Sequence, residues 1–329
     1  YQDDIGFDNT KNMVLVQAQT EARRQRYAKA AEIVGNFVSQ VKAQTDQVDL
    51  TQPEAALHLY GIRSKLPPST LERPARDVAV EAEFREVDLS ALGDTAKRGY
   101  VLCIPASVNG RSCRAVLDTG CPTTFCSLDY ARKVGAWLLP DTINVNGAGK
   151  AHGFFGVIDS IRVGDMTFRN AEVVCVDDAM VMDSLLTGDF VIGLDFMRHC
   201  GEMQVYPREG RVVFPAKPSP LPETGRNICL TENNGLRIET YVGGERLKMM
   251  FDTGNNTTTF SASYYVRHKQ DIDKTGTRVT RLSGGIGRVG MKTLILLPPL
   301  TVRTGGTDIR LGKACVDFEP NYTLAPDDG

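Results

Sequence analysis

An Asp-Thr-Gly triplet occurs twice in the sequence, at Asp118-Thr119-Gly120 and at Asp252-Thr253-Gly254. One isolated triplet is typical of a polar turn, in which Asp and Gly serve the backbone. Here each triplet follows an apolar run, Ala115–Leu117 or Leu247–Phe251, and precedes a Thr-rich segment. Duplication in matching surroundings indicates a site made from two equivalent halves.

Two carboxyl groups held about 3 Å apart cannot both ionise, so they share one proton and titrate as a coupled pair. The ionised member takes a proton from water, and the protonated member donates to the carbonyl of the bond that breaks. This chemistry suits amide hydrolysis without a covalent intermediate. Asp118 and Asp252 are therefore the predicted catalytic pair. A carboxylate metal site is disfavoured, because the Thr-Gly after each Asp adds no charged ligand.

The repeat extends beyond the triplets. Upstream of each apolar run lies a dipeptide typical of a hairpin turn, Asn109-Gly110 or Gly243-Gly244. Each run is therefore expected to pair with the strand before that turn. Downstream, Val174–Asp177 resembles Ala314–Asp317, so Cys175 and Cys315 are expected to be counterparts. The simplest interpretation is two lobes of one design. From about residue 78 onward, the strands are predicted from short β-branched runs bounded by Gly, Asn and Asp, at Tyr100–Ala106, Ser112–Leu117, Phe154–Val163, Ala171–Val176 and Arg211–Phe214.

The N-terminal part has a different pattern. Apolar residues spaced by three and four predict one long amphipathic helix from about Asp8 to Gln47. A second helix is expected to begin at Thr51, as a cap ahead of Pro53, and to end near Gly61. The predicted divisions are a helical segment and linker at 1–80, a first lobe at 81–217 and a second lobe at 218–329.

The composition narrows the function. The 329 residues contain 38 Lys and Arg against 40 Asp and Glu, a formal charge of −2, so no global basic field exists to hold nucleic acid. No apolar run approaches the roughly 20 residues that a membrane span needs. The four histidines are scattered and the eight cysteines form no Cys-x-x-Cys pair. No metal or cofactor is predicted.

The two triplets, together with Val191–Met197, resemble the retropepsin-like (clan AA) aspartic proteases of bacteria and retroviruses. The resemblance covers residues 84–214 and 236–329. It implies a mainly β fold of two retropepsin-like (acid protease) β-barrel lobes that form an intramolecular pseudo-dimer, as in pepsin, after the helical segment. It also implies an aspartyl endopeptidase that cleaves an extended peptide or protein.

The resemblance assigns supporting roles to further residues. Thr119 and Thr253 would hydrogen-bond across the lobe junction, and Gly120 and Gly254 would let the two loops approach closely. A strand with Gly193 and Asp195, leading into a short helix, would lie beneath the loops. Flaps would come from residues 145–156 and 283–290, for which ordinary Gly-rich hairpin loops are an equal alternative.

Two departures from the family pattern affect the site. Where the family favours Ala or Ser after the triplet, this chain has Cys121 and Asn255. Asn255 could hydrogen-bond its carboxylate, whereas Cys121 is a weak donor, so the two Asp residues are expected to differ. Cys121 and Cys126 could form a disulfide or remain thiols. The second-lobe counterpart of Gly193 is expected beyond residue 329, so that lobe is expected to lack its C-terminal strand and helix.

Several alternatives stay open. The main alternative to a protease is a catalytically inactive peptide-binding or regulatory module of the same fold. The N-terminal helices could be an inhibitory prosegment, a docking appendage for a partner, or a packing element. The cysteine count, the start at Tyr1 and the exported bacterial look-alikes favour the periplasm or cell envelope, with the cytoplasm as the alternative.

Overall fold

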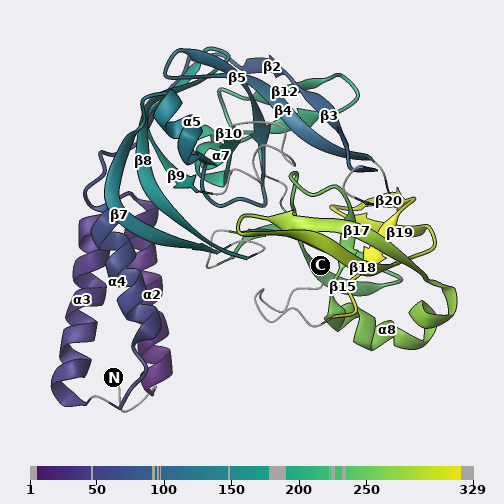
Figure 1. Cartoon of the computed structure of the whole chain (residues 1–329), viewed down its shortest axis with the longest axis horizontal. Coiled ribbons are helices and arrows are strands. Elements are labelled where there is room, and N and C mark those ends of the chain that lie inside the picture. The colour runs from purple at the N-terminus through teal and green to yellow at the C-terminus, as the bar shows by residue number, and fades with distance from the viewer. Residues whose placement is uncertain are drawn as a thin grey trace.

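A computed structural model gives the architecture, which is mainly β, with helices at the N-terminus and two β-rich lobes after them (Figure 1). The structure describes residues 6–45, 47–90, 93–94, 96, 98–146, 149–177, 190–221, 223, 227–231 and 235–319. Among the helices in these ranges, none is both long and apolar enough to cross a membrane.

The N-terminal bundle consists of α2 (Phe7–Arg23), α3 (Tyr27–Gln44) and α4 (Thr51–Arg63). The prediction of one long helix over 8–47 is wrong. The helix is interrupted at Gln25, which adopts a φ of 60°. The Gln25 side chain offsets this unfavourable backbone by donating to Ser69 O at 2.9 Å and accepting from Ser69 N at 2.6 Å. The break lets α2 fold back so that Ala18 joins the buried core of the bundle with Val34.

The second predicted helix is confirmed, but its expected cap is not. Thr51 is the first residue of α4, and its N–H donates to Asp49 Oδ1 at 2.9 Å. The helix continues two residues past Gly61, which brings Arg63 onto the first lobe.

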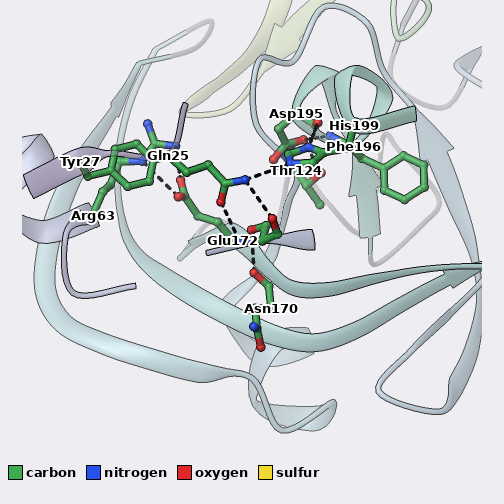
Figure 2. Close-up of polar contacts among 10 residues, drawn as sticks. Gln25, Tyr27, Arg63, Thr124, Asn170, Glu172, Asp195, Phe196 and His199 are labelled. Atoms are coloured by element: carbon green, nitrogen blue, oxygen red, sulfur yellow. Dashed lines mark hydrogen bonds and ion pairs between the residues drawn. The ribbon is translucent and has the colours of Figure 1, made fainter. Parts of the chain in front are cut away.

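Arg63 connects the bundle to the first lobe. Its guanidinium lies 2.8 Å from Glu172 Oε1 and donates to Glu172 Oε2 at 3.1 Å and to the Tyr27 hydroxyl at 2.5 Å (Figure 2). Around this polar contact, Ile62 packs in an apolar cluster with Leu139 and Phe155. The bundle is therefore seated on the hairpin formed by β7 (Trp137–Asn146) and β8 (Lys150–Val163).

The first lobe is built on one large sheet with the strand order β1-β9-β6-β10-β5-β4-β8-β7, while β3 pairs with β4 at its side. Its smaller sheet has the order β11-β12-β2. β10 pairs in parallel with β5 and antiparallel with β6, so it joins two parts of the large sheet. The remaining elements of this lobe are β1 (Thr70–Glu72), β2 (Val78–Glu81), β3 (Glu83–Asp88), β4 (Arg98–Val108), β5 (Arg111–Leu117), β6 (Phe125–Ser127), α5 (Leu128–Lys133), β9 (Met166–Val176), β10 (Phe190–Ile192), α7 (Leu194–Cys200), β11 (Gln204–Tyr206) and β12 (Arg211–Phe214).

The lobe begins earlier than the sequence predicts. β1 pairs with β9 and β2 pairs with β12, so strands of the first lobe lie before residue 81. The supposed linker therefore contributes an edge strand to the large sheet.

In the second lobe the described strands form two separate sheets. One has the order β13-β14-β19-β20 with β15 on β14, and the other has the order β16-β21-β18-β17. The elements are β13 (Ile228–Leu230), β14 (Leu236–Val242), β15 (Glu245–Met250), β16 (Thr258–Phe260), α8 (Ala262–Thr275), β17 (Thr277–Gly285), β18 (Arg288–Leu296), β19 (Leu300–Thr304), β20 (Thr307–Leu311) and β21 (Ala314–Val316).

The internal repeat is visible in both turns and register. The two hairpin turns have the same backbone conformation. Positive φ angles, which a tight hairpin turn requires, occur at Asn109 and Gly110 in one turn and at Gly243 and Gly244 in the other. The strands after the triplets pair in parallel, with Cys126 opposite Cys175 and Phe260 opposite Val316. Since Cys126 and Phe260 lie equally far beyond their Asp residues, Val316 rather than Cys315 is the counterpart of Cys175.

We predict that Glu172→Ala lowers the free energy of unfolding by about 3 kcal/mol, because it leaves the mostly buried Arg63 guanidinium without its carboxylate. The control is Glu72→Ala, which removes an exposed ion pair with Arg169 and should cost less than about 1 kcal/mol. Urea denaturation followed by circular dichroism measures both variants. Equal losses would show that the Arg63 contact does not anchor the bundle.

Candidate active site

The two Asp-Thr-Gly loops are tied together by reciprocal hydrogen bonds. Thr119 N donates to Thr253 Oγ1 at 3.0 Å, and Thr253 N donates to Thr119 Oγ1 at 3.0 Å. Each hydroxyl also donates to the carbonyl oxygen of the residue that precedes the opposite Asp. Thr119 donates to Phe251 O at 2.7 Å, and Thr253 donates to Leu117 O at 2.6 Å. Four bonds thus cross the junction in a twofold pattern.

The carboxyl groups lie against the opposite loop. A Cβ added at Gly120 would lie 2.5 Å from Asp252 Cγ, and one added at Gly254 would lie 2.7 Å from Asp118 Cγ. Each carboxylate also accepts from its own glycine N–H at 2.8 Å. Glycine is required at both positions because any side chain would displace the facing carboxyl group.

The two carboxyl groups interact electrostatically. Burial raises the pKa of Asp118 to about 7, and the negative charge of Asp252 and a hydrogen bond between the two side chains add to this increase. Donation from the Gly120 N–H opposes it only in part. The pair can therefore hold a proton at pH values where an isolated Asp is fully ionised.

The first loop rests on β10 and α7. A Cβ at Gly193 would lie 2.7 Å from the Thr123 carbonyl carbon, so glycine permits this close packing. The Asp195 carboxylate accepts from Thr124 N at 2.9 Å, from the Thr124 hydroxyl at 2.6 Å and from Phe196 N at 2.8 Å (Figure 2). The sequence suggested Gly193 and Asp195 but missed Thr124, the residue through which Asp195 contacts the loop.

Asn255 and Cys121 make their hydrogen bonds within their own loops. Asn255 Oδ1 accepts from Thr257 N at 3.2 Å, and Cys121 Sγ donates to Thr123 O at 2.9 Å. Burial and the nearby Asp118 raise the pKa of the Cys121 thiol well above its usual value. The proposed contact from Asn255 to its carboxylate stays a prediction.

All eight cysteines are free thiols, including Cys121 and Cys126. The Cys126 sulfur lies 4.0 Å from that of Cys175 on the neighbouring strand rather than bonded to Cys121. The envelope location expected from the sequence stays a prediction.

Two hairpins meet tip to tip at the junction. Gly149, beside the tip of the β7–β8 hairpin, donates its N–H to Ile286 O in the β17–β18 turn at 3.0 Å. Gly287, with a φ of 82°, packs so closely that an added Cβ would lie 2.8 Å from the carbonyl carbon of Gly149. In Figure 1 the two hairpins reach toward each other from opposite lobes. These are the segments predicted as flaps, although residues 147–148 lie outside the described ranges.

A further link between the lobes was not anticipated from the sequence. The buried Asp94 carboxylate accepts from Leu282 N at 2.6 Å and lies 3.6 Å from the Arg281 guanidinium. Arg281 and Leu282 belong to β17, so a loop of the first lobe holds the β17–β18 hairpin. Asp94 lies far from any motif in the sequence, so no local pattern could have revealed this contact.

No group of three or more His, Cys, Asp or Glu side chains suited to a metal occurs within the described ranges. The two Asp loops bring a pair of carboxyl groups together, an arrangement that suits acid–base chemistry.

Comparisons with known proteins find one family over part of the chain. Residues 104–196, which contain the first triplet and Gly193-Leu194-Asp195, match the family model described as aspartyl protease. The resemblance to retropepsin-like aspartic proteases is thereby confirmed. The solved structures that match include a retropepsin-like aspartic protease from Rickettsia conorii, 12% identical, with a TM-score of 0.27, covering 44% of this chain and 92% of that one. The search of curated proteins gave no match.

We predict that Thr119→Ala and Thr253→Ala each lower the free energy of unfolding by about 2 kcal/mol, because each removes hydrogen bonds to the backbone of the opposite loop. Serine keeps the hydroxyl, so the Thr→Ser variants serve as matched controls and should retain most of the stability. Chemical denaturation measures all four. Equal stability of the Ala and Ser variants would mean that these bonds do not join the lobes.

Proposed function

We propose that the chain is an aspartic endopeptidase in which the two lobes form an intramolecular pseudo-dimer and Asp118 and Asp252 form the catalytic dyad. The observation that carries the proposal is the reciprocal packing of the two loops, in which each carboxyl group lies against the glycine of the other. The match of residues 104–196 to the aspartyl protease family supports protease activity in general.

The dyad works by sharing one proton. With one carboxyl group protonated and the other ionised, the carboxylate takes a proton from a water molecule between them as the water attacks the peptide carbonyl. The protonated member donates to the carbonyl oxygen, which gives a tetrahedral diol. The dyad then returns a proton to the leaving amine nitrogen as the C–N bond breaks, and the carboxylic acid product leaves. The raised pKa of Asp118 fits a dyad that keeps one proton between its two carboxyl groups.

The substrate is an extended peptide held between the dyad and the two hairpin tips. The hydrogen bond between Gly149 and Ile286 joins the two hairpin tips above the junction between the lobes. An extended peptide beneath the tips can form hydrogen bonds with the hairpin backbone. Because the tips touch in this structure, the hairpins must separate to admit a substrate. Asp94 would hold the base of β17 during that movement.

For the N-terminal helices we favour the packing role. The bundle contacts the outer side of the β7–β8 hairpin through Arg63 and Ile62. Among the described residues, no hydrogen bond or ion pair joins a helix of the bundle to Asp118 or Asp252. This arrangement supports the β7–β8 hairpin.

The first test replaces each Asp separately. Asp118→Asn and Asp252→Asn should each lower the rate of casein or peptide-library cleavage by roughly 10²–10⁴-fold, because neither carboxyl group alone can both activate water and protonate the carbonyl. The control is Asp165→Asn, which changes an exposed Asp in an ion pair with Arg76 and should leave the rate unchanged. Near-normal cleavage by either dyad variant would identify a different catalyst.

The same assay separates the alternative function. A catalytically inactive peptide-binding module would bind a statine-type inhibitor or an extended peptide but show no turnover at any pH. Cleavage that depends on both Asp residues excludes that alternative.

The pH dependence follows from the raised pKa of Asp118. The active dyad carries one proton, which it loses as the pH rises through about 7, so activity should fall over that range. At low pH both carboxyl groups become protonated and activity should fall again. A pH profile of kcat/KM measures this. Full activity above pH 9 would contradict a shared proton in the catalytic form.

A further inference from the structure

The corner between α2 and α3, residues 24–26, contacts the first lobe through the side chain of Gln25. Its Nε2 donates to Ser69 O at 2.9 Å, and its Oε1 accepts from Ser69 N at 2.6 Å. The same Nε2 lies 3.2 Å from His199 Nε2 on α7. Because Ser69 N–H requires an acceptor, the Gln25 amide has one orientation, with its nitrogen toward His199.

The hydrogen bonds of His199 define its protonation state. Its Nδ1 lies 2.8 Å from Asp195 O, and a carbonyl oxygen only accepts, so Nδ1 carries a proton. Gln25 presents an N–H to Nε2, so Nε2 must be the acceptor. The contact therefore requires the neutral ring in its Nδ1–H tautomer. Protonation would place two donors opposite each other, and Gln25 cannot turn its oxygen toward His199 without breaking both bonds to Ser69.

Asp195 connects this contact to the candidate site. Its backbone carbonyl accepts from His199, and its carboxylate accepts from the N–H and the hydroxyl of Thr124 (Figure 2). Leu194 N, in the first turn of the same helix, donates to Cys121 O at 2.9 Å, directly after the first Asp-Thr-Gly triplet. A continuous set of hydrogen bonds thus leads from the helical bundle to the first Asp loop.

We propose that Gln25 and His199 are positioning residues for the loop of Asp118. The neutral His199 ring joins the bundle to the backbone of α7, and α7 holds the loop through Asp195. Protonation of His199 breaks its contact with Gln25, so this support weakens as the pH falls. Histidine is the side chain that ordinarily changes charge between about pH 5 and 8. The inference deepens the proposed function and rests on it, since it gives the bundle a part in the catalytic geometry.

The elements packed against His199 carry other groups that affect its surroundings. The Phe168 ring of β9 lies 4.7 Å from the His199 ring, measured between centroids. The charged or titratable groups are Arg23, Tyr27 and Arg63 of the bundle, Glu21 with its partners Arg24 and Arg26, Arg73 after β1, and Arg198 on α7. A change at Gln25 leaves all of these groups in place. Comparing variants at one pH therefore isolates the Gln25–His199 contact.

Gln25→Glu reverses what the contact requires of His199. A carboxylate has no N–H to donate to the neutral ring, but it accepts from Nε2–H of the protonated ring. At about pH 8 we expect the kcat of Gln25→Glu to be about fivefold below that of the unsubstituted chain, with KM little changed. At about pH 5.5 the ratio of the two kcat values should rise to about one or above. The dyad is the same in both proteins, so its own titration cancels in this ratio.

Two further variants control the comparison. Gln17→Glu makes the same chemical change at an exposed position of α2, and its kcat should match that of the unsubstituted chain at both pH values. His199→Ala removes the group that titrates. In the His199→Ala background, the effect of Gln25→Glu should therefore be the same at both pH values.

Two measurements do not depend on cleavage. Long-range ¹H–¹⁵N NMR of the chain labelled with ¹⁵N-histidine reads the tautomer, with His199→Ala identifying the signal. At about pH 8 we expect the Nδ1–H form, and in Gln25→Glu the ring should keep its second proton to a pH about one unit higher. Amide exchange at Thr124 N should be about fivefold faster in Gln25→Glu than in the unsubstituted chain at about pH 8, and no faster at about pH 5.5.

The Nε2–H tautomer at His199, or an effect of Gln25→Glu that is equal at both pH values, would overturn the proposal. An equal effect of Gln17→Glu would do the same. Should Gln25→Glu fail to fold, His199→Ala replaces it, and unchanged exchange at Thr124 N would then refute the assignment. If the unsubstituted chain cleaves no peptide, the proposed protease function fails, whereas the tautomer and the Thr124 exchange still decide whether Gln25 and His199 position the loop.

Discussion

The candidate site depends on the hydrogen bonds that two threonine side chains form across the junction between the lobes. Thr119 and Thr253 each accept from the backbone of the opposite loop and donate to the residue before the opposite Asp. This pattern fixes the two loops in position and orientation, and the glycines then allow the carboxyl groups to pack against the facing loop. Burial and the nearby charge of Asp252 raise the pKa of Asp118, so the pair can hold a proton near neutral pH. A small set of polar contacts thus converts two similar lobes into one site.

The lobes support this site unequally. Behind the first loop lies a continuous sheet with β10 and α7 packed into it, and Asp195 fixes Thr124 from below. The helical bundle adds support on the β7–β8 hairpin through Arg63. The described part of the second lobe has a smaller buried core and two separate sheets, and its hairpin is held by Asp94 of the first lobe. Among the described residues, the first lobe is therefore the more extensively packed half of the site.

The sequence predicted the two loops and their supporting strands well, because duplication marks positions that must be equivalent and hairpin turns need glycine or asparagine at positive φ. Features set by distant contacts could not be predicted. Gln25 breaks the first helix although it has ordinary helix propensity, since Ser69 holds its side chain. Asp94 and Arg281 are far apart in the chain, and Thr70–Glu72 becomes a strand only because β9 offers an edge.

The central claim is that Asp118 and Asp252 share one proton. The most direct measurement is a ¹³C NMR titration of the chain labelled at the aspartate carboxyl carbons, with Asp118→Asn and Asp252→Asn used to assign the two signals. The account predicts that one proton remains on the pair up to about pH 7, and that Asp252→Asn lowers the pH at which Asp118 titrates. Two independent titrations near pH 4, each unaffected by removal of the other carboxyl group, would contradict it.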